Sequence, residues 1–288
     1  KMRSLLTMLG IIIGVAAVIA MIGIGEGARA DVQAQISTLG TNLLMVFPGS
    51  VTSGGVRGGF GSITSMTPED AQALLDGCPS VAKVAPTVRT VAQVVAGNQN
   101  WSTAISGAGA DYMEIRDWPI DKGLNFTDLD VRSAAKVCVL GATVAEKLFP
   151  DQDPVGQVIR IKKVPFTVLG VAVRKGGTSM GSDQDDVIIA PYTTIQKRLL
   201  GIVHIQGMMV SAVSKERIDE AQEEINAVLR RRHRIPPGGN DDFMIRAQSD
   251  IAQTAEATSK VMTMLLGSIA SVSLLVGGIG IMNIMLVS

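Results

Sequence analysis

Two long, uncharged apolar segments, one near each end, constrain this 288-residue chain more than any other feature of its sequence. The first covers residues 4–25 and the second covers residues 261–288. An α-helix rises about 1.5 Å per residue and the hydrocarbon core of a bilayer is about 30 Å thick, so about 20 apolar residues suffice to cross it. A buried helix of a globular protein is rarely uncharged over this length. The sequence therefore predicts two transmembrane helices that flank a large outer domain.

The flanks of the first segment leave one alternative open and indicate an orientation. Lys1 and Arg3 precede the segment, and residues 28–30 have the small-x-small form of a signal-peptide cleavage site. The apolar run is longer than that of an ordinary signal peptide, so we favour a retained helix. By the positive-inside rule the N-terminus then lies in the cytoplasm and residues 26–260 lie outside it. The second apolar run reaches Ser288 without a basic anchor, and we expect more sequence to follow.

The charge balance and the cysteines limit the classes of partner and of covalent chemistry. Lys plus Arg and Asp plus Glu both number 26, so the chain lacks the basic excess of nucleic-acid-binding proteins. Cys78 and Cys138 are the only cysteines. A disulfide between them suits an oxidising compartment, whereas the apolar run around Cys138 is typical of a buried free thiol.

The outer domain contains two predicted strand–helix–strand units, which together favour an α/β sandwich with its helices on one face of an antiparallel sheet. The elements of these units are strands at 43–47, at 207–213 and at 242–246, a pair of strands within 81–105, and helices that open at Thr67 and Ser214. A Gly- and Ser-rich stretch at 49–65 predicts a mobile loop.

Residues 110–203, between the two units, predict a smaller inserted domain that is rich in strands. Its candidate strands lie at 135–140, 157–161, 166–173 and 186–190, and its one candidate helix lies at 142–148. Residues 25–39 and 248–260 predict helices that extend the two apolar segments as a stalk. The resulting division is 1–40 (first membrane helix and stalk), 41–109 (sandwich, first part), 110–203 (insertion), 204–247 (sandwich, second part) and 248–288 (stalk and second membrane helix).

Motifs that carry chemistry are weak in this sequence. Residues 177–181 match G-x-S-x-G around Ser179, but acidic residues follow where a helix is required, so a plain glycine-rich loop is the better interpretation. Asp183, Asp185 and Asp186 allow either a hard-cation site or a solvated acidic loop, and we favour the loop. Zinc-ligand spacing and a phosphate-binding P-loop are absent from the sequence. We therefore predict no catalytic, cofactor-binding or metal-binding residues and a chain that is not itself an enzyme.

The apolar segments carry a signal for helix packing instead. Small residues allow membrane helices to approach closely, and a polar amide within an apolar run can form a hydrogen bond between helices. The candidate packing residues are Gly10, Gly14, Ala17, Gly277, Gly278, Gly280 and Asn283.

Several motifs, taken together, resemble the MacB-type ABC transporter permeases of the FtsX-like superfamily. The resemblance extends from end to end, and the last of its motifs is the most specific. The motifs are LGIIIGV at 9–15, LGTNL at 39–43, PG at 48–49, LFP at 148–150, PVG at 154–156, DQDD at 183–186 and VGGIGIMNIMLVS at 276–288.

The resemblance implies an α+β membrane protein of the bacterial inner membrane, of the Gram-negative type, with residues 26–260 in the periplasm. It implies a periplasmic sandwich called the porter domain, an inserted sabre domain, and four membrane helices per subunit, of which this sequence would hold two. The implied partners are a second copy, an ATPase domain that uses ATP and Mg²⁺, a periplasmic membrane-fusion adaptor, a TolC-like outer-membrane channel and the lipid bilayer. The implied mechanism is mechanotransmission, in which ATP-driven movement in the cytoplasm passes through the stalk and drives export of periplasmic substrate.

Three other functions are compatible with the architecture. Two membrane helices around an outer domain are also typical of sensors, although sensor domains are usually helical bundles. A lipoprotein-release permease belongs to the same broad superfamily. A membrane-anchored hydrolase would depend on Ser179 alone.

Overall fold

The computed structural model describes residues 42–49, 64–177 and 183–248 without a break, together with residues 52–53, residues 56–57 and single positions within 12–27 and 250–282. The chain forms two compact units, one of Lys1–Ser37 with Ser249–Ser288 and one of Thr38–Gln248.

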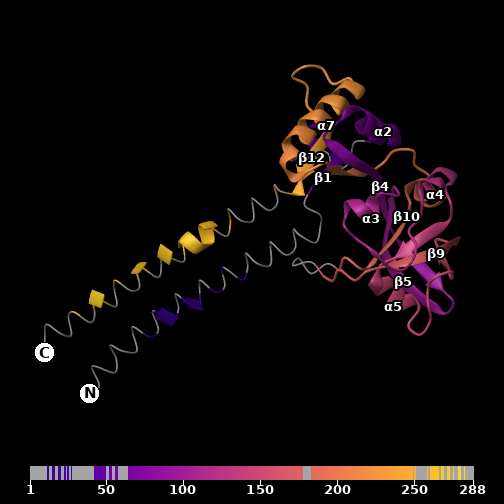
Figure 1. The fold of residues 1–288 in the computed structure, drawn as a ribbon, viewed down its shortest axis with the longest axis horizontal. Coiled ribbons are helices and arrows are strands. Elements are labelled where there is room, and N and C mark those ends of the chain that lie inside the picture. The colour runs from indigo at the N-terminus through magenta and orange to yellow at the C-terminus, as the bar shows by residue number, and fades with distance from the viewer. Residues whose placement is uncertain are drawn as a thin grey trace. The chain divides into compact units, whose positions relative to one another are not determined.

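A ten-stranded sheet organises the second unit (Figure 1). Its strands follow the order β12-β1-β11-β4-β5-β10-β7-β9-β6, and β8 pairs with both β4 and β9. The strands are β1 (Leu43–Pro48), β4 (Val81–Ala96), β5 (Gln99–Ala108), β6 (Ile120–Gly123), β7 (Val137–Leu140), β8 (Val158–Ile161), β9 (Val164–Ala172), β10 (Val187–Pro191), β11 (Gly207–Ala212) and β12 (Phe243–Ala247). The helices are α2 (Pro68–Gly77), α3 (Tyr112–Ile115), α4 (Asp128–Ser133), α5 (Ala142–Leu148), α6 (Tyr192–Thr194) and α7 (Ile218–Arg232).

One end of the sheet is the predicted sandwich. β12, β1, β11 and β4 are antiparallel neighbours, and α2 and α7 pack together over them. The apolar faces of the helices, with Leu74 on α2 and Ile225 on α7, join the same buried cluster as Leu44 of β1 and Val210 of β11. The predicted pairing of two strand–helix–strand units with helices on one face is therefore confirmed.

The other end of the sheet contains the strand-rich part of the chain. β5 pairs in parallel with β10, and β7 pairs in parallel with β9, whereas the remaining pairs are antiparallel. A second buried cluster, which includes Trp118, Phe126 and Ile189, packs here. β4 crosses the whole unit, because its first half pairs with β11 and its second half pairs with β5 and β8.

The sequence missed or misplaced several short elements. Ser214 is the N-cap of a 3-10 turn at Lys215–Arg217 that continues directly into α7 at Ile218, so the predicted helix start is confirmed and its first turn is 3-10 instead of α-helical. α3, α4 and β6 were not predicted, and neither was the π-helical turn at Ile195–Leu200. Elements this short contain too few residues for a hydrophobic period to show.

The disulfide alternative is wrong, because both cysteines are buried free thiols. Burial raises the pKa of Cys78 to about 11, with the carboxylate of Glu224 adding to the shift. Burial also raises the pKa of Cys138. Both groups therefore remain thiols at neutral pH and behave as small apolar side chains.

The first unit contains all the positions predicted to cross the membrane. Its described positions within 12–27 and 258–282 are helical, and a Cβ added at Gly25 would lie 3.4 Å from the Oγ1 of Thr263. Of the seven candidate packing residues only Gly278 lies among the described positions, where it is exposed and an added Cβ would meet nothing within 4 Å. The other six lie outside them. Among the positions that are described, no helix has both the length and the apolarity that crossing a bilayer requires.

Of the predicted mobile loop at 49–65, the structure describes two short strands, β2 (Thr52–Ser53) and β3 (Val56–Arg57), which pair with each other. Ser179 of the G-x-S-x-G motif lies outside the described residues.

Candidate functional site

A polar cluster, buried at Asp70 and His233 and open to solvent at Arg232 and Asp242, joins α2, α7 and the start of β12. We call these four residues the helix clamp. The Nε of Arg232 donates a hydrogen bond to Asp70 Oδ1 at 2.7 Å. The ring of His233 lies between two carboxylates, with Nδ1 2.7 Å from Asp242 Oδ1 and Nε2 3.4 Å from Asp70 Oδ2. The clamp therefore ties the N-terminal end of one helix to the C-terminal end of the other and to a strand.

Local sequence places these four side chains. Thr67 and Pro68 begin α2, and Asp70 accepts a hydrogen bond from the backbone N–H of Thr67 at 2.8 Å, as the third residue of a capping box does. Arg232 and His233 end α7, where positive charge favours the helix dipole. The sequence identified both helix ends but gave no signal that they meet.

The electrostatics of the clamp depend on Asp70, whose side chain is only 3% exposed. Burial alone would raise the pKa of Asp70, but hydrogen bonds from Arg232 and from the Thr67 backbone, together with the His233 ring, hold that pKa below its usual value of 3.8. Asp70 is therefore ionised at neutral pH. A buried carboxylate in this state is stable only while its partners remain in place.

A second contact continues the clamp along the turn that follows α7. Arg230 forms an ion pair with Asp241, and its Nη2 donates hydrogen bonds to the carbonyl oxygens of Pro236 at 3.0 Å and Gly239 at 3.2 Å. The arginines at the end of α7 thus fix the turn that leads into β12. β12 is the last strand before the chain returns to the first unit.

The helix clamp suits mechanical coupling better than catalysis. The His233 side chain is 8% exposed, and both of its ring nitrogens face carboxylates. Such a ring is held in place and has little access to a substrate. The hydrogen bonds join three separate elements of the fold.

The prediction of a solvated acidic loop is wrong for Asp185, although Asp183 is exposed and Asp186 is half-buried. Asp185 is fully buried and accepts hydrogen bonds from the backbone N–H groups of Lys175 at 2.9 Å and Gly176 at 2.8 Å. Asp183 accepts from the Thr143 hydroxyl at 2.6 Å, and Asp186 accepts from the indole N–H of Trp101 at 2.8 Å. The three carboxylates therefore accept hydrogen bonds from three different parts of the fold. Among the described residues, no three His, Cys, Asp or Glu side chains are grouped so that they could hold a metal.

Gly141 gives a test of how tightly this acidic loop is packed. A Cβ at Gly141 would lie 2.2 Å from the backbone oxygen of Asp185, so Gly141→Ala must displace the loop backbone. We expect a loss of about 2 kcal/mol in the free energy of unfolding, measured by urea denaturation. The matched variant is Gly77→Ala, where the added Cβ meets only a side-chain methyl of Val228 at 3.2 Å. An equal effect of the two substitutions would contradict the tight packing.

A pair of cations flanks the buried indole of Trp118. The guanidinium of Arg116 lies 5.0 Å and the ammonium of Lys175 lies 5.7 Å from the ring centroid. Burial lowers the pKa of Lys175, and the charge of Arg116 lowers it further. Lys175 also donates a hydrogen bond to the carbonyl of Arg116 at 2.7 Å, so this cluster fixes the segment that leads into the acidic loop.

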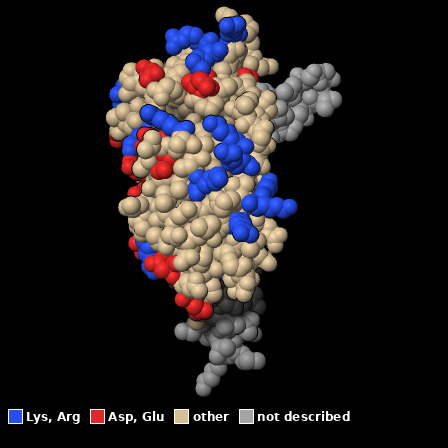
Figure 2. Space-filling view, turned by 90° about the vertical axis from the view of Figure 1, so that its right-hand side faces the viewer, with Lys and Arg blue, Asp and Glu red and all other residues tan. Residues whose placement is uncertain are grey.

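The face seen in Figure 2 carries both signs of charge. Lys and Arg side chains lie at its top, centre and right, and Asp and Glu side chains lie near its top, along its left margin and at its lower end.

Residues 4–228 match the family of MacB-like periplasmic core domains. Curated relatives named macrolide export ATP-binding/permease protein MacB match nearly the whole chain. The protein from Syntrophobacter fumaroxidans is 39% identical, with 100% of this chain and 48% of the relative covered. The protein from Chlorobaculum tepidum is 43% identical, with 100% of this chain and 44% of the relative covered. The chain thus spans less than half the length of these relatives.

Two solved structures share the fold. The periplasmic region of MacB from Actinobacillus actinomycetemcomitans gives a TM-score of 0.63 at 24% identity, covering 78% of this chain and 97% of that one. The extracellular domain of the noncanonic ABC-type transporter YknZ from Gram-positive bacteria gives a TM-score of 0.57 at 18% identity, covering 72% of this chain and 100% of that one. At these identities the likeness concerns the fold alone.

Proposed function

Because the chain belongs to the family of MacB-like periplasmic core domains, we propose that it is the permease part of an ABC-type efflux system that drives export by mechanotransmission. The observation that carries the proposal is identity of about 40% along the whole chain to relatives named as export permeases. The chain matches the permease part of those relatives and not their ATP-binding part. The helix clamp supports the mechanical aspect, because it joins β12, the strand that precedes residues 248–260 in the sequence, to both covering helices.

The proposed assembly has two copies of this chain in the inner membrane, with the N-terminus in the cytoplasm and residues 26–260 in the periplasm. An ATPase domain, fused or separate, supplies ATP and Mg²⁺ chemistry. A periplasmic adaptor and a TolC-like channel carry the cargo outward.

A macrolide is the first cargo to test, because the relatives carry that substrate in their names. The whole gene, with its adaptor, is expressed in a bacterium that lacks its own macrolide exporter. We expect higher erythromycin resistance and faster efflux, both of which disappear when the ATPase active site is inactivated. Unchanged resistance in cells with normal protein level and ATPase activity would contradict macrolide export and favour a different cargo, such as a lipoprotein.

A further inference from the structure

We infer that an exposed apolar surface at the strand-rich end of the sheet docks a protein segment that carries aliphatic and acidic side chains. The surface consists of Arg89, Val91 and Val95 on β4 with Val158 and Arg160 on β8, and we call it the valine face. The inference rests on the proposed function for the partner to test, which is the periplasmic adaptor. It does not depend on the cargo.

The pairing of β8 closes part of the sheet into a ring, which gives its strands an inner and an outer side. β4, β5, β10, β7, β9 and β8 pair in that order, and β8 pairs back with β4. Val94 of β4 and Ile159 and Ile161 of β8 belong to the buried cluster on the inner side. Because successive residues of a strand point to opposite sides, the valine face lies on the outer side.

The three valines of this face are open to solvent, although the solvated side of a strand usually carries polar residues. Val91 is 65% exposed, Val95 is 40% exposed and Val158 is 55% exposed. Val95 pairs with Arg160, so Val158 lies diagonally across from Val95. Apolar side chains that share one surface mark a docking site, whereas single exposed ones do not. Valine also has few rotamers, so its burial loses little entropy.

Two cations accompany the valines and indicate the charge of the partner. Arg89 precedes Val91 on the outer side of β4, and Arg160 lies opposite Val95. Both arginines are exposed, and neither guanidinium forms an ion pair with another described residue. Complementary charge therefore favours a partner with carboxylates. A bilayer is the poorer fit, because the side chains that insert into lipid are long or aromatic, whereas these are short valines.

An open stretch of backbone adjoins the valines. β11 pairs with β4 as far as Thr87, and β8 pairs with β4 at residues 94–95. Between them, the N–H of Arg89 donates a hydrogen bond to Oε1 of Gln206 at 2.7 Å. The backbone groups of Val91, two residues further on, face the same edge, where none of the described strands pairs with them. A partner segment can therefore form backbone hydrogen bonds beside the valines.

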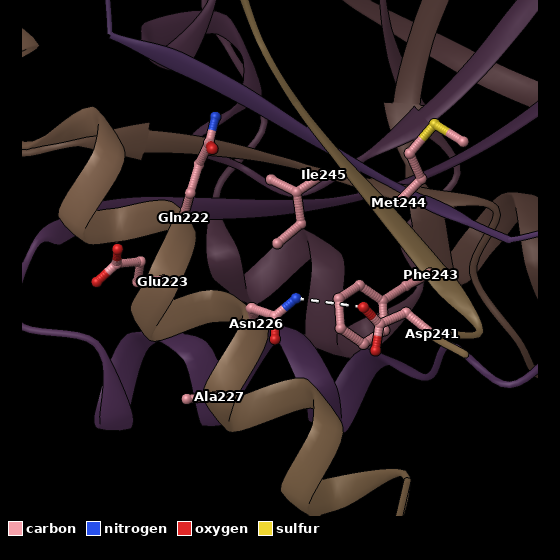
Figure 3. Close-up of a pocket in the computed structure, with 8 residues that line it drawn as sticks. All are labelled: Gln222, Glu223, Asn226, Ala227, Asp241, Phe243, Met244 and Ile245. Carbon is pink, nitrogen blue, oxygen red and sulfur yellow. Dashed lines mark hydrogen bonds between the residues drawn. The ribbon is translucent and has the colours of Figure 1, made fainter. Parts of the chain in front are cut away.

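A hollow of about 610 Å³ between α7 and β12 is a competing place for a partner (Figure 3). Figure 3 shows Ile245 directed into this space and Asn226 joined to Asp241. Asp241 also pairs with Arg230, so these polar groups are already used within the chain. No Lys or Arg is among the described residues that line the hollow. The hollow therefore suits an acidic partner poorly and serves as the control surface.

The first test places the photo-crosslinking amino acid p-benzoylphenylalanine at Val91 of the full chain, expressed in cells together with the adaptor. We expect irradiation to give a covalent adduct with the adaptor. Ala227, which is exposed and lines the hollow, is the matched control position and should give no adaptor adduct. An adaptor adduct at Ala227 with none at Val91 would overturn the inference. A Val91 adduct that forms only with lipid would overturn it as well.

The second test measures the Kd of the adaptor for the full chain in lipid nanodiscs. Arg89→Glu together with Arg160→Glu should raise the Kd about tenfold, because attraction becomes repulsion, whereas Arg89→Lys together with Arg160→Lys should change it less than about twofold. Arg132→Glu, at an exposed arginine of α4, is the matched control and should bind like the wild type. Equal Kd values for the wild type and the Arg89→Glu, Arg160→Glu chain would overturn the inference and leave the proposed function in place. A wild-type chain that does not bind the adaptor would overturn both the proposed assembly and this inference.

Discussion

Inserting seven residues of glycine and serine after Leu39, or between Asp250 and Lys260, should abolish cargo export while ATP hydrolysis and membrane insertion continue. Under the proposed mechanism, residues 26–39 and 248–260 carry movement from the membrane to the periplasmic unit. Neither segment contains a proline, so the sequence permits continuous helices there. A Gly/Ser linker behaves as a flexible coil and transmits little force. Efflux and ATPase rates are measured in the same vesicles.

The matched control inserts seven alanine-rich, helix-forming residues at the same positions. Seven residues are about two helical turns, so the faces of the helix stay in phase. Export should survive this insertion to a much greater extent. Normal export in cells that carry both Gly/Ser insertions at wild-type protein level would contradict mechanotransmission and favour a substrate path through the membrane.

Replacing Asp70 with alanine should lower the free energy of unfolding by about 3 kcal/mol, because the substitution leaves Arg232 and His233 without a buried partner. The fluorescence of Trp101 and Trp118, the only tryptophans of the chain, reports unfolding in urea. Asp76→Ala is the control, since Asp76 lies on the exposed side of the same helix and accepts one hydrogen bond from Gln72. We expect that substitution to change stability by at most about 0.5 kcal/mol. Equal losses of stability for the two substitutions would contradict the stabilising role of the helix clamp.

The same carboxylate should make stability fall in acid. The pKa of Asp70 is lower in the folded chain than its usual value of 3.8, so the unfolded chain binds the proton more readily. The stabilisation that the ionised Asp70 provides is complete at pH values above 3.8. It is lost as the pH falls below 3.8 and then through the lower pKa that Asp70 has in the folded chain. Urea denaturation of the wild type and of Asp70→Asn between pH 6 and about pH 3 should show a shallower acid slope for the variant. Parallel slopes would contradict this assignment.

The helices and strands that have a clear hydrophobic periodicity or a helix-capping motif were predictable from the sequence. Residues 81–105 predicted two strands turned at Gly97, and the structure has β4 and β5 around that turn. Thr67-Pro68 correctly predicted the start of α2. These signals are local, because caps, turns and alternation act within a few residues.

The helix clamp and the acidic loop were not predictable in the same way. Asp70 and His233 are far apart in sequence, and nothing near either residue specifies the other. Asp185 belongs to a run of polar residues that is typical of a solvated loop, yet tertiary contacts bury it completely. The type of a residue and of its sequence neighbours does not predict which distant backbone groups will pack around it.

The arrangement of β1 has a consequence for the order of folding. β1 is the first strand of the sheet, and its partners among the described strands are β11, at residues 208–211, and β12, at residues 243–247. Synthesis begins at the N-terminus, so β1 is made before β11 and β12. It therefore has neither of these partner strands until almost the entire second unit has been synthesised. The hairpin of β4 and β5 pairs neighbouring residues and can form early, because short loops close quickly. We therefore expect the strand-rich end of the sheet to fold first and the end that contains β1 to close last. β1 is then the segment most in need of protection from aggregation until its partner strands have been synthesised.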